Sequence, residues 1–127
     1  MRKSPNIEAA IRAGKIEPGM SFNQRVWALT ARIPRGRVST YGELAKAMGT
    51  KAYRAVGNAM NKNPYAPGVP CHRVVGSDGA LTGYAHGLGK KKQMLEKEGF
   101  ACSQKKVAVG KVFTASELIG KHSMITW

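Results

Sequence analysis

Residues 40–61 read TYGELAKAMGTKAYRAVGNAMN, and this stretch decides the fold class. Thr40 and Glu43 form a capping-box pattern at the start of a short helix that ends at Gly49. A second helical stretch is expected over residues 52–61. Two short helices joined by a tight turn that contains glycine predict a helix-turn-helix. The apolar side of the first helix consists of Leu44, Ala45 and Met48.

The second of these helices has two different faces. Arg54, Asn58 and Asn61 follow one another at positions i, i+4 and i+7, so they share one face. Such a face can be simple solvated surface, or it can contact a partner. On the second helix of a helix-turn-helix in a basic protein, contact with DNA is the favoured interpretation. The opposite, inward face is formed by Val56, Ala59 and Met60.

The charge of the chain points to a polyanionic partner. Its 127 residues include 21 Lys and Arg against 7 Asp and Glu, a formal net charge of +14. Nucleic acid is the favoured partner, with an anionic membrane surface and an acidic protein as alternatives. Binding through phosphates should weaken as salt is added. No apolar run is long enough to cross a bilayer, and none follows the basic start, so neither a membrane span nor a secretory signal is expected.

The remaining chain is predicted to hold further helices around one core, which a hydrophobic fraction of 43% can form without disulfides. Ser21 and Gln24 form a second capping-box pattern, and the helix that they start should run to Ile33 and end at Pro34. The fold class is mainly α, winged-helix-like, with a helix-turn-helix and a short β element. The other expected segments are a weak helix at 7–13, extended chain at 37–40 and 71–75, a stiff loop at 63–70, a turn at 76–79, a helix at 90–98, a strand-like piece at 107–113 and a helix at 115–120.

Two cysteines, Cys71 and Cys102, are expected to be thiols in a reducing compartment. A cysteine is only a few per cent thiolate at neutral pH unless a base or a positive charge acts on it, and His72 and Arg73 are candidates for that role. Adjacent side chains of an extended segment point to opposite faces, so a water molecule is the expected link between Cys71 and His72. A carboxylate behind His72 would fix its tautomer. Taken alone, a cysteine beside a histidine is more often structural than catalytic.

Several fragments together resemble one family. Pro70-Cys71-His72-Arg73-Val74 resembles the active-site motif of the O6-alkylguanine-DNA alkyltransferases. Residues 54–60 are similar to the recognition helix of that family, and Asn63-Pro64 lies between the two at the family's spacing. Gly83-Tyr84 and the stretch from residue 92 to residue 99 complete the match, which covers residues 22–99. The resemblance implies a domain at 21–99, with a flank at 1–20 and an extension of unknown role at 100–127.

The resemblance implies a role for each matching residue of the reaction centre. Cys71 corresponds to the alkyl acceptor, and His72 to the general base that acts on the thiol through a water molecule. Glu98 corresponds to the acid that orients this histidine, and Asn63 to the residue that braces the active-site turn against the recognition helix. Tyr41 corresponds to the hydroxyl donor to guanine N3, which also touches the rotated phosphate. Neither a metal nor a cofactor is implied.

A second group of residues corresponds to the surface that receives DNA. Arg54 matches the finger that enters the duplex and replaces the extruded nucleotide. The carbonyls of Cys71 and Val74 match acceptors for the guanine amino group, the N–H of Ala85 matches the donor to O6, and Tyr84 matches a pocket wall. The other expected DNA-binding residues on the recognition helix are Ala55, Gly57, Asn58 and Asn61.

The implied function is repair of duplex DNA by transfer of one alkyl group from O6-alkylguanine, or O4-alkylthymine, to Cys71. The base must be flipped out for this, and the thioether product is not hydrolysed, so each molecule acts once. The expected form is a monomer, with cooperative binding to DNA possible, in the cytoplasm of a prokaryote or the nucleus of a eukaryote. One alternative is a non-enzymatic lesion sensor that recruits excision-repair proteins, although such proteins typically lack the cysteine. The other is a helix-turn-helix regulator with an incidental cysteine.

Individual residues also have simpler interpretations. Tyr41 can be a core residue of its helix, Glu98 a surface acid, and Arg54 a contact to phosphate alone. Cys102 is interpreted as structural or incidental, and His86 and His122 as surface residues. His86 lies beside the expected pocket, where bulky alkyl groups would fit less well.

The chain also departs from the family pattern. Tyr53 and Asn58 are bulkier than the small residues that let this kind of helix enter the minor groove. Most members carry a separate amino-terminal domain, which is not expected in this chain. Its loss would remove scaffold and any metal site lying there, but none of the residues named above.

Overall fold

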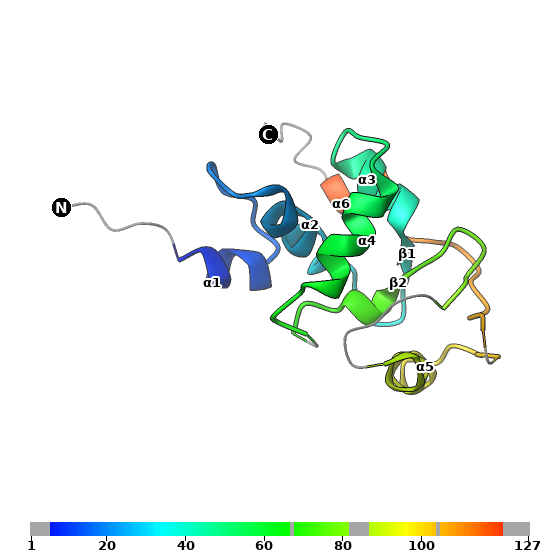
Figure 1. The fold of residues 1–127 in the computed structure, drawn as a ribbon. Coiled ribbons are helices and arrows are strands. Elements are labelled where there is room, and N and C mark those ends of the chain that lie inside the picture. The colour runs from blue at the N-terminus through cyan, green and yellow to red at the C-terminus, as the bar shows by residue number, and fades with distance from the viewer. Residues whose placement is uncertain (1–5, 67, 82–86, 104, 121–127) are drawn as a thin grey trace.

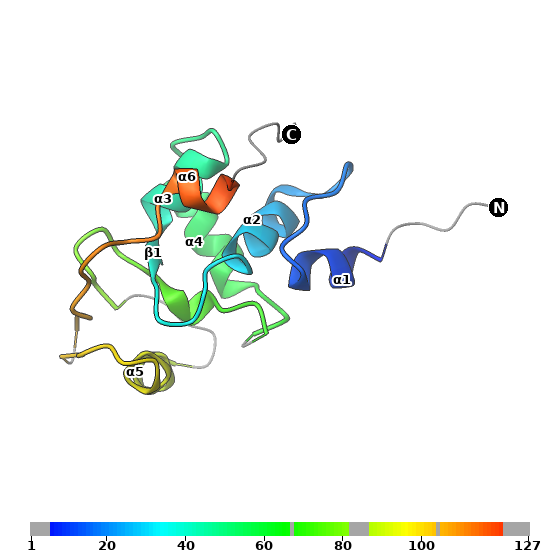
Figure 2. The ribbon, with the colours of Figure 1, turned by 180° about the vertical axis from the view of Figure 1, so that it is seen from behind.

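The computed structural model describes residues 6–66, 68–81, 87–103 and 105–120. In Figures 1 and 2, α4 lies between α2 and a short sheet, while α5 lies at the end of the molecule away from α3 and α6. The predicted fold class is confirmed: mainly α, with a helix-turn-helix and a short β element. The elements are α1 (Ile7–Arg12), α2 (Phe22–Thr30), β1 (Ser39–Thr40), α3 (Tyr41–Ala47), α4 (Tyr53–Asn61), a 3₁₀ helix (Cys71–Arg73), β2 (Val74–Val75), α5 (Leu88–Lys97) and α6 (Ala115–Ile119).

Helix α2 begins as predicted and ends earlier than predicted. Ser21 Oγ accepts from the Gln24 N–H at 3.1 Å, and Gln24 Oε1 accepts from the Ser21 N–H at 2.8 Å, so the capping box is confirmed. The expected end near Ile33 is wrong. The N–H groups of Arg32 and Ile33 donate to carbonyls three residues back, which tightens the chain into a turn after Thr30. Ile33 is nevertheless buried.

The helix-turn-helix is formed by α3 and α4, as the sequence predicts. Thr40 Oγ1 accepts from the Glu43 N–H at 3.0 Å and caps α3. The second half of the predicted capping box is wrong, because Glu43 Oε1 accepts from the Ala115 N–H at 2.7 Å instead of returning to Thr40. Gly49 follows α3 with φ +73°, a left-handed conformation that ends the helix cheaply only with glycine.

A two-stranded parallel sheet connects the helix-turn-helix to the segment that contains Cys71. Ser39 pairs with Val74 and Thr40 with Val75, and all four residues are buried. The expected extended conformation over residues 71–75 is correct for Val74–Val75 and wrong for Cys71–Arg73. The N–H of Arg73 donates to the Pro70 carbonyl at 2.9 Å and that of Val74 to the Cys71 carbonyl, three residues back in each case, which coils the chain into a 3₁₀ turn.

The segment after α5 runs back along one side of the molecule to α3, as both ribbon views show. The strand expected at residues 107–113 is wrong: the described residues there make scattered hydrogen bonds and an isolated bridge between Cys102 and Val107. Helix α6 is confirmed, and it begins with a capping box of Thr114 and Glu117 that the sequence analysis did not use. Leu118 of α6 is fully buried in the main core.

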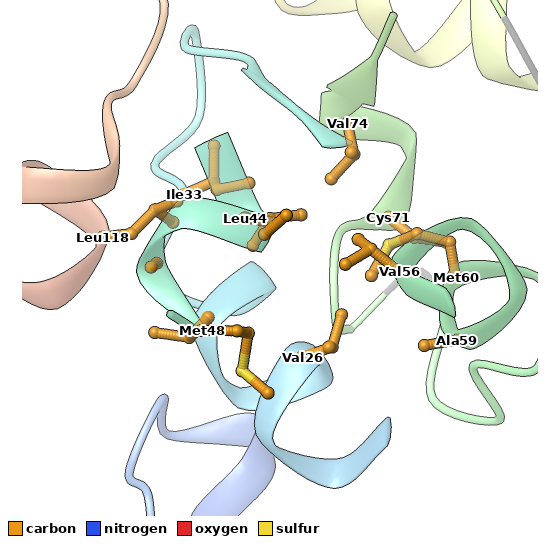
Figure 3. Close-up of a cluster of buried hydrophobic side chains, with 13 residues drawn as sticks. Val26, Ile33, Leu44, Met48, Val56, Ala59, Met60, Cys71, Val74 and Leu118 are labelled. Carbon is orange, nitrogen blue, oxygen red and sulfur yellow. The ribbon is translucent and has the colours of Figure 1, made fainter. Parts of the chain in front are cut away.

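The main core lies between α2, α3, α4 and α6, and Cys71 belongs to it. Figure 3 shows the Cys71 side chain beside Val56 and Met60 of α4. The nucleophile candidate is therefore packed directly under the helix whose other face is exposed. A second cluster lies nearer α5 and the tail and consists of Val38, Val75, Leu81, Leu95 and Val107. A third joins α1 to α2 and consists of Ala10, Ile11, Met20 and Val69.

Candidate functional site

Cys71 is buried, and Asn63 connects the turn that carries it to the end of α4. Its side chain is 3% exposed at the start of the 3₁₀ helix. Asn63, which follows α4, donates from its side-chain amide to the Val69 carbonyl at 3.0 Å and accepts from the Tyr65 N–H at 2.9 Å. It also hydrogen-bonds the Cys71 thiol. Asn63 therefore connects the end of α4 to the turn that carries the cysteine, in agreement with the role that the family resemblance implies for it.

The thiol of Cys71 is not activated by its surroundings alone. Burial raises its pKa, while the hydrogen bond from Asn63 and the charge of Lys91 oppose this without cancelling it. A thiol with a raised pKa stays protonated at neutral pH, so it needs a base to become a nucleophile.

Such a base is next to it in the chain. His72 Nε2 lies 2.7 Å from Glu98 Oε2, and the two side chains are only 3% and 4% exposed. Burial lowers the pKa of His72, and the interaction with Glu98 offsets part of that effect, so the ring is neutral at neutral pH. A neutral imidazole beside a carboxylate carries its proton on Nε2, which leaves Nδ1 as the basic nitrogen. The interpretation of Glu98 as a surface acid is wrong, because its carboxylate is buried.

Glu98 remains ionised because several donors surround it. Arg73 donates to it from Nε and Nη2 at 3.0 Å, and the Gly36 N–H donates to Oε1 at 3.1 Å. Burial alone would raise the pKa of Glu98, but the hydrogen bonds from Arg73, His72 and Gly36 outweigh it, and the pKa lies below its usual value. The same guanidinium donates to the Ile33 carbonyl at 2.9 Å. Arg73 is thus directed at Glu98 and not at the thiol, contrary to its expected part in activating Cys71.

Lys91 is the functional candidate that the sequence analysis missed. It is fully buried, and its Nζ donates to the Val74 carbonyl at 2.6 Å. Nζ also lies 6.0 Å from the centre of the Tyr41 ring. Burial lowers the pKa of Lys91 to about 8, and the interaction with Cys71 acts in the opposite direction. Lys91 therefore contacts Val74, lies near the ring of Tyr41 and interacts electrostatically with Cys71, three residues that the sequence analysis had assigned to the site.

A signal for Lys91 is present in the sequence. Lys91 stands at helical spacing before Leu95 of α5 and before Glu98, the residue that follows α5, so the three residues lie on one side of the helix and its end. Leu95 is fully buried and the Glu98 side chain is 4% exposed. Because Lys91 lies in a run of three consecutive lysines, its sequence position suggests a solvent-exposed side chain. Only its helical spacing to Leu95 and Glu98 distinguishes it from the lysines on either side.

Tyr41 and the outer face of α4 form the exposed side of the site. The Tyr41 ring is half-buried against the main core, so the simpler interpretation as a packing residue holds for part of its surface. Arg54, Asn58 and Asn61 are all exposed, as predicted. Ala55 and Gly57 are half-buried, and a side chain added at Gly57 would meet open space. Tyr53 is 53% exposed at the start of the helix.

Some of the predicted residues lie outside the described part of the chain: Tyr84, Ala85, His86 and His122. Cys102 is half-buried and packs against the second hydrophobic cluster, apart from the residues around Cys71. Within the described ranges, no group of three or more histidine, cysteine or acidic residues could hold a metal ion. The described helices include none that is both long and apolar enough to cross a membrane.

Comparisons with known proteins fit this geometry. The family model described as "6-O-methylguanine DNA methyltransferase, DNA binding domain" matches residues 21–100. A "methylated-DNA–protein-cysteine methyltransferase" of Methanosarcina acetivorans is 53% identical over 87 residues, which cover 67% of this chain and 56% of that protein. The chain thus spans about half the length of the curated relatives that it matches.

Two solved structures are similar to the fold and carry DNA. The Mycobacterium tuberculosis OGT in complex with DNA superposes with a TM-score of 0.60 at 42% identity and covers 73% of this chain and 63% of that one. The S. pombe Atl1, in complex with damaged DNA containing O6-carboxymethylguanine, gives a TM-score of 0.59 at 34% identity, with coverage of 70% and 88%.

Proposed function

The chain belongs to the 6-O-methylguanine DNA methyltransferase family, and on that premise we propose that it repairs DNA by moving an alkyl group from guanine O6 to Cys71. The observation that carries the proposal is the buried pair of His72 and Glu98, whose side chains are 2.7 Å apart. His72 lies in the same 3₁₀ turn as Cys71, and Glu98 directly follows α5. A buried thiol with a raised pKa beside a neutral, oriented histidine is the arrangement that a base-activated nucleophile requires.

The proposed reaction is one displacement at a saturated carbon. The thiol proton passes through a water molecule to His72, and the sulfur of Cys71 attacks the alkyl carbon. A carbon–sulfur bond forms as the carbon–oxygen bond breaks, and its electron pair returns to the guanine ring. The ring takes a proton from the Tyr41 hydroxyl, and Tyr41 is reprotonated through water by the proton that His72 received from the thiol. The net result is transfer of one proton from the thiol to guanine. The thioether is stable, so each molecule reacts once.

The exposed face of α4 is the proposed DNA contact. Arg54, Asn58 and Asn61 point away from the core, and no acidic residue lies within α4. Since a target base inside the stack is inaccessible, the nucleotide must be flipped, and Arg54 is proposed to fill the space that it leaves. The net charge of +14 favours the approach to the phosphates.

Lesion recognition without transfer is the second candidate function. Its support is the similarity to Atl1, of which 88% is covered at 34% identity. Cys71 and its buried neighbours favour transfer, because a sensor does not need an activated thiol.

One experiment separates the two functions. The protein is mixed with duplex DNA that contains O6-methylguanine, and the mass of the peptide that contains Cys71 is measured. We expect that peptide to gain one methyl group, and Cys71→Ser to abolish the gain while it preserves binding. An unmodified Cys71 together with preferential binding to the lesion would favour the sensor. No modification and no preference for the lesion would refute both.

A further inference from the structure

Tyr53 is the one large hydrophobic side chain that the described residues leave exposed, with 53% of its surface accessible. It is the first residue of α4 and directly precedes Arg54. A single exposed tyrosine means little by itself. Two further observations bear on this residue: where its ring lies, and which charged residues are near it in the chain.

The ring of Tyr53 leans from α4 onto the start of α3. A side-chain carbon added at Gly42 would lie 3.8 Å from Tyr53 Cε1 and 3.7 Å from Thr40 Oγ1. Gly42 is the second residue of α3 and follows Tyr41. The aromatic ring therefore lies at the junction of the two helix starts, on the side where Tyr41 begins α3.

Two cationic residues lie close to Tyr53 in the sequence. Lys51 and Arg54 flank Tyr53 in the chain, and both are exposed. The acid nearest in the sequence, Glu43, is engaged by the Ala115 N–H at 2.7 Å and by Lys46 at 3.4 Å. An exposed aromatic ring among cationic side chains is the combination that proteins use to stack nucleobases while they hold the phosphates.

We propose that Tyr53 is a second stacking group for DNA, which packs against the base step next to the one that Arg54 enters. This inference rests on the proposed function, because it assumes that a nucleotide is extruded at α4. Stacking on an opened step stabilises the flipped state and contributes little to an intact duplex. Tyr53 therefore acts on base flipping and sets how strongly the protein depends on Arg54 for it.

The test compares Tyr53→Ala, Tyr53→Phe and Tyr53→Leu on duplexes with O6-methylguanine and a neighbouring 2-aminopurine, whose fluorescence reports flipping. Loss of one stacked ring should lower the flipping equilibrium of Tyr53→Ala about tenfold. Affinity for undamaged duplex should stay within about twofold of the wild type, since phosphate contacts are unchanged. Tyr53→Phe should flip like the wild type, and Tyr53→Leu should fall between. Gln93→Ala, an exposed polar change on α5, is the matched control and should have no effect.

Two results would overturn the inference alone: flipping by Tyr53→Ala at the wild-type level, or an equal loss in Tyr53→Phe, which would assign the effect to the hydroxyl. In both cases methyl transfer by the wild-type protein would leave the proposed function standing. A wild-type protein that neither flips the base nor takes up a methyl group would remove the proposed function and this inference with it.

Discussion

His72 Nε2 and Glu98 Oε2 are 2.7 Å apart although the two residues are 26 positions apart in the chain. Their side chains are almost completely buried, and the carboxylate is shared with Arg73. A buried carboxylate is stable only when its charge is compensated. The chain thus uses one arginine to keep the acid ionised and the same acid to orient the histidine.

Arg73→Gln should change how the site titrates. Without the guanidinium, the pKa of Glu98 rises because it loses its strongest donor, and the pKa of His72 rises because a positive charge is removed. Since His72 must be neutral to act as a base, the acid limb of the transfer rate should move to higher pH. NMR titration of the His72 ring measures the shift directly.

The stability of Arg73→Gln should follow the same logic. A depressed pKa of Glu98 stabilises the fold above the unfolded value of about 4.3, and this stabilisation is lost as the pH falls through the folded pKa. The variant should lose about 2 kcal/mol at pH 7, the usual contribution of hydrogen bonds to a charged group, and progressively less in acid. Arg35→Gln is the control, because Arg35 donates to the Lys97 carbonyl and not to Glu98. If His72 has the same pKa in the wild type and in Arg73→Gln, Arg73 does not influence the protonation of His72.

Lys91→Met should remove a pH-dependent part of the stability. The folded protein loses the Lys91 proton near pH 8, whereas the unfolded chain keeps it to about 10.4, so the wild type should gain about 1 kcal/mol between pH 7 and pH 9. The variant should lack this gain in urea denaturation. Its Cys71 should also react more slowly with a small alkylating reagent, because the positive charge that lowers the thiol pKa is gone. Equal pH dependence in both proteins would show that Lys91 does not titrate in this range.

Leu118→Ala tests whether the tail belongs to the folded domain. Leu118 is fully buried in the main core, and its carbonyl accepts from Arg32 Nη1 at 2.7 Å. The cavity left by the substitution should cost about 2–4 kcal/mol. Ile119→Ala, at the half-buried next position, should cost only about 1 kcal/mol. Equal, small losses in thermal or urea unfolding would mean that α6 contributes little to the core.

Arg54→Ala distinguishes a wedge from a phosphate contact. If Arg54 fills the opened step, the variant should flip the lesion poorly while its affinity for undamaged duplex and the salt dependence of that affinity stay nearly constant. If Arg54 only meets a phosphate, flipping and affinity should fall together, and the slope of log affinity against log salt should decrease by about one. Fluorescence with 2-aminopurine and titrations at several salt concentrations provide both measurements.

The sequence predicts the local features of this fold well and its long-range contacts poorly. The capping box of Ser21 and Gln24 and the two faces of α4 are confirmed because caps and helical period are encoded within a few residues. The 3₁₀ turn at Cys71 was missed, since valines after the cysteine favour extended chain and the turn is made by hydrogen bonds to the Pro70 and Cys71 carbonyls.

In the candidate site, too, some contacts were predicted from the sequence and others were not. The 2.7 Å contact of His72 with Glu98 agrees with the pairing that the family resemblance implied. The partners of Arg73 depend on how α5 packs against the 3₁₀ turn, which no local pattern reports. The buried position of Lys91 is indicated only by its helical spacing to Leu95 and Glu98. Glu43 shows the opposite error, because its side chain fits a capping box in sequence but is drawn to the Ala115 N–H in the fold.

The pairing of Ser39 with Val74 and Thr40 with Val75 makes the sheet a rigid spacer. One strand leads directly into Tyr41, and the other follows directly after Arg73. The offset between these two points is therefore set by backbone hydrogen bonds and not by the loop of residues 63–70. Natural or engineered changes in the length of this loop would leave the offset unchanged. A shift of one residue in the strand pairing would turn each strand residue to the opposite face. It would also displace Tyr41, which is proposed to contact the base, from Cys71 and His72.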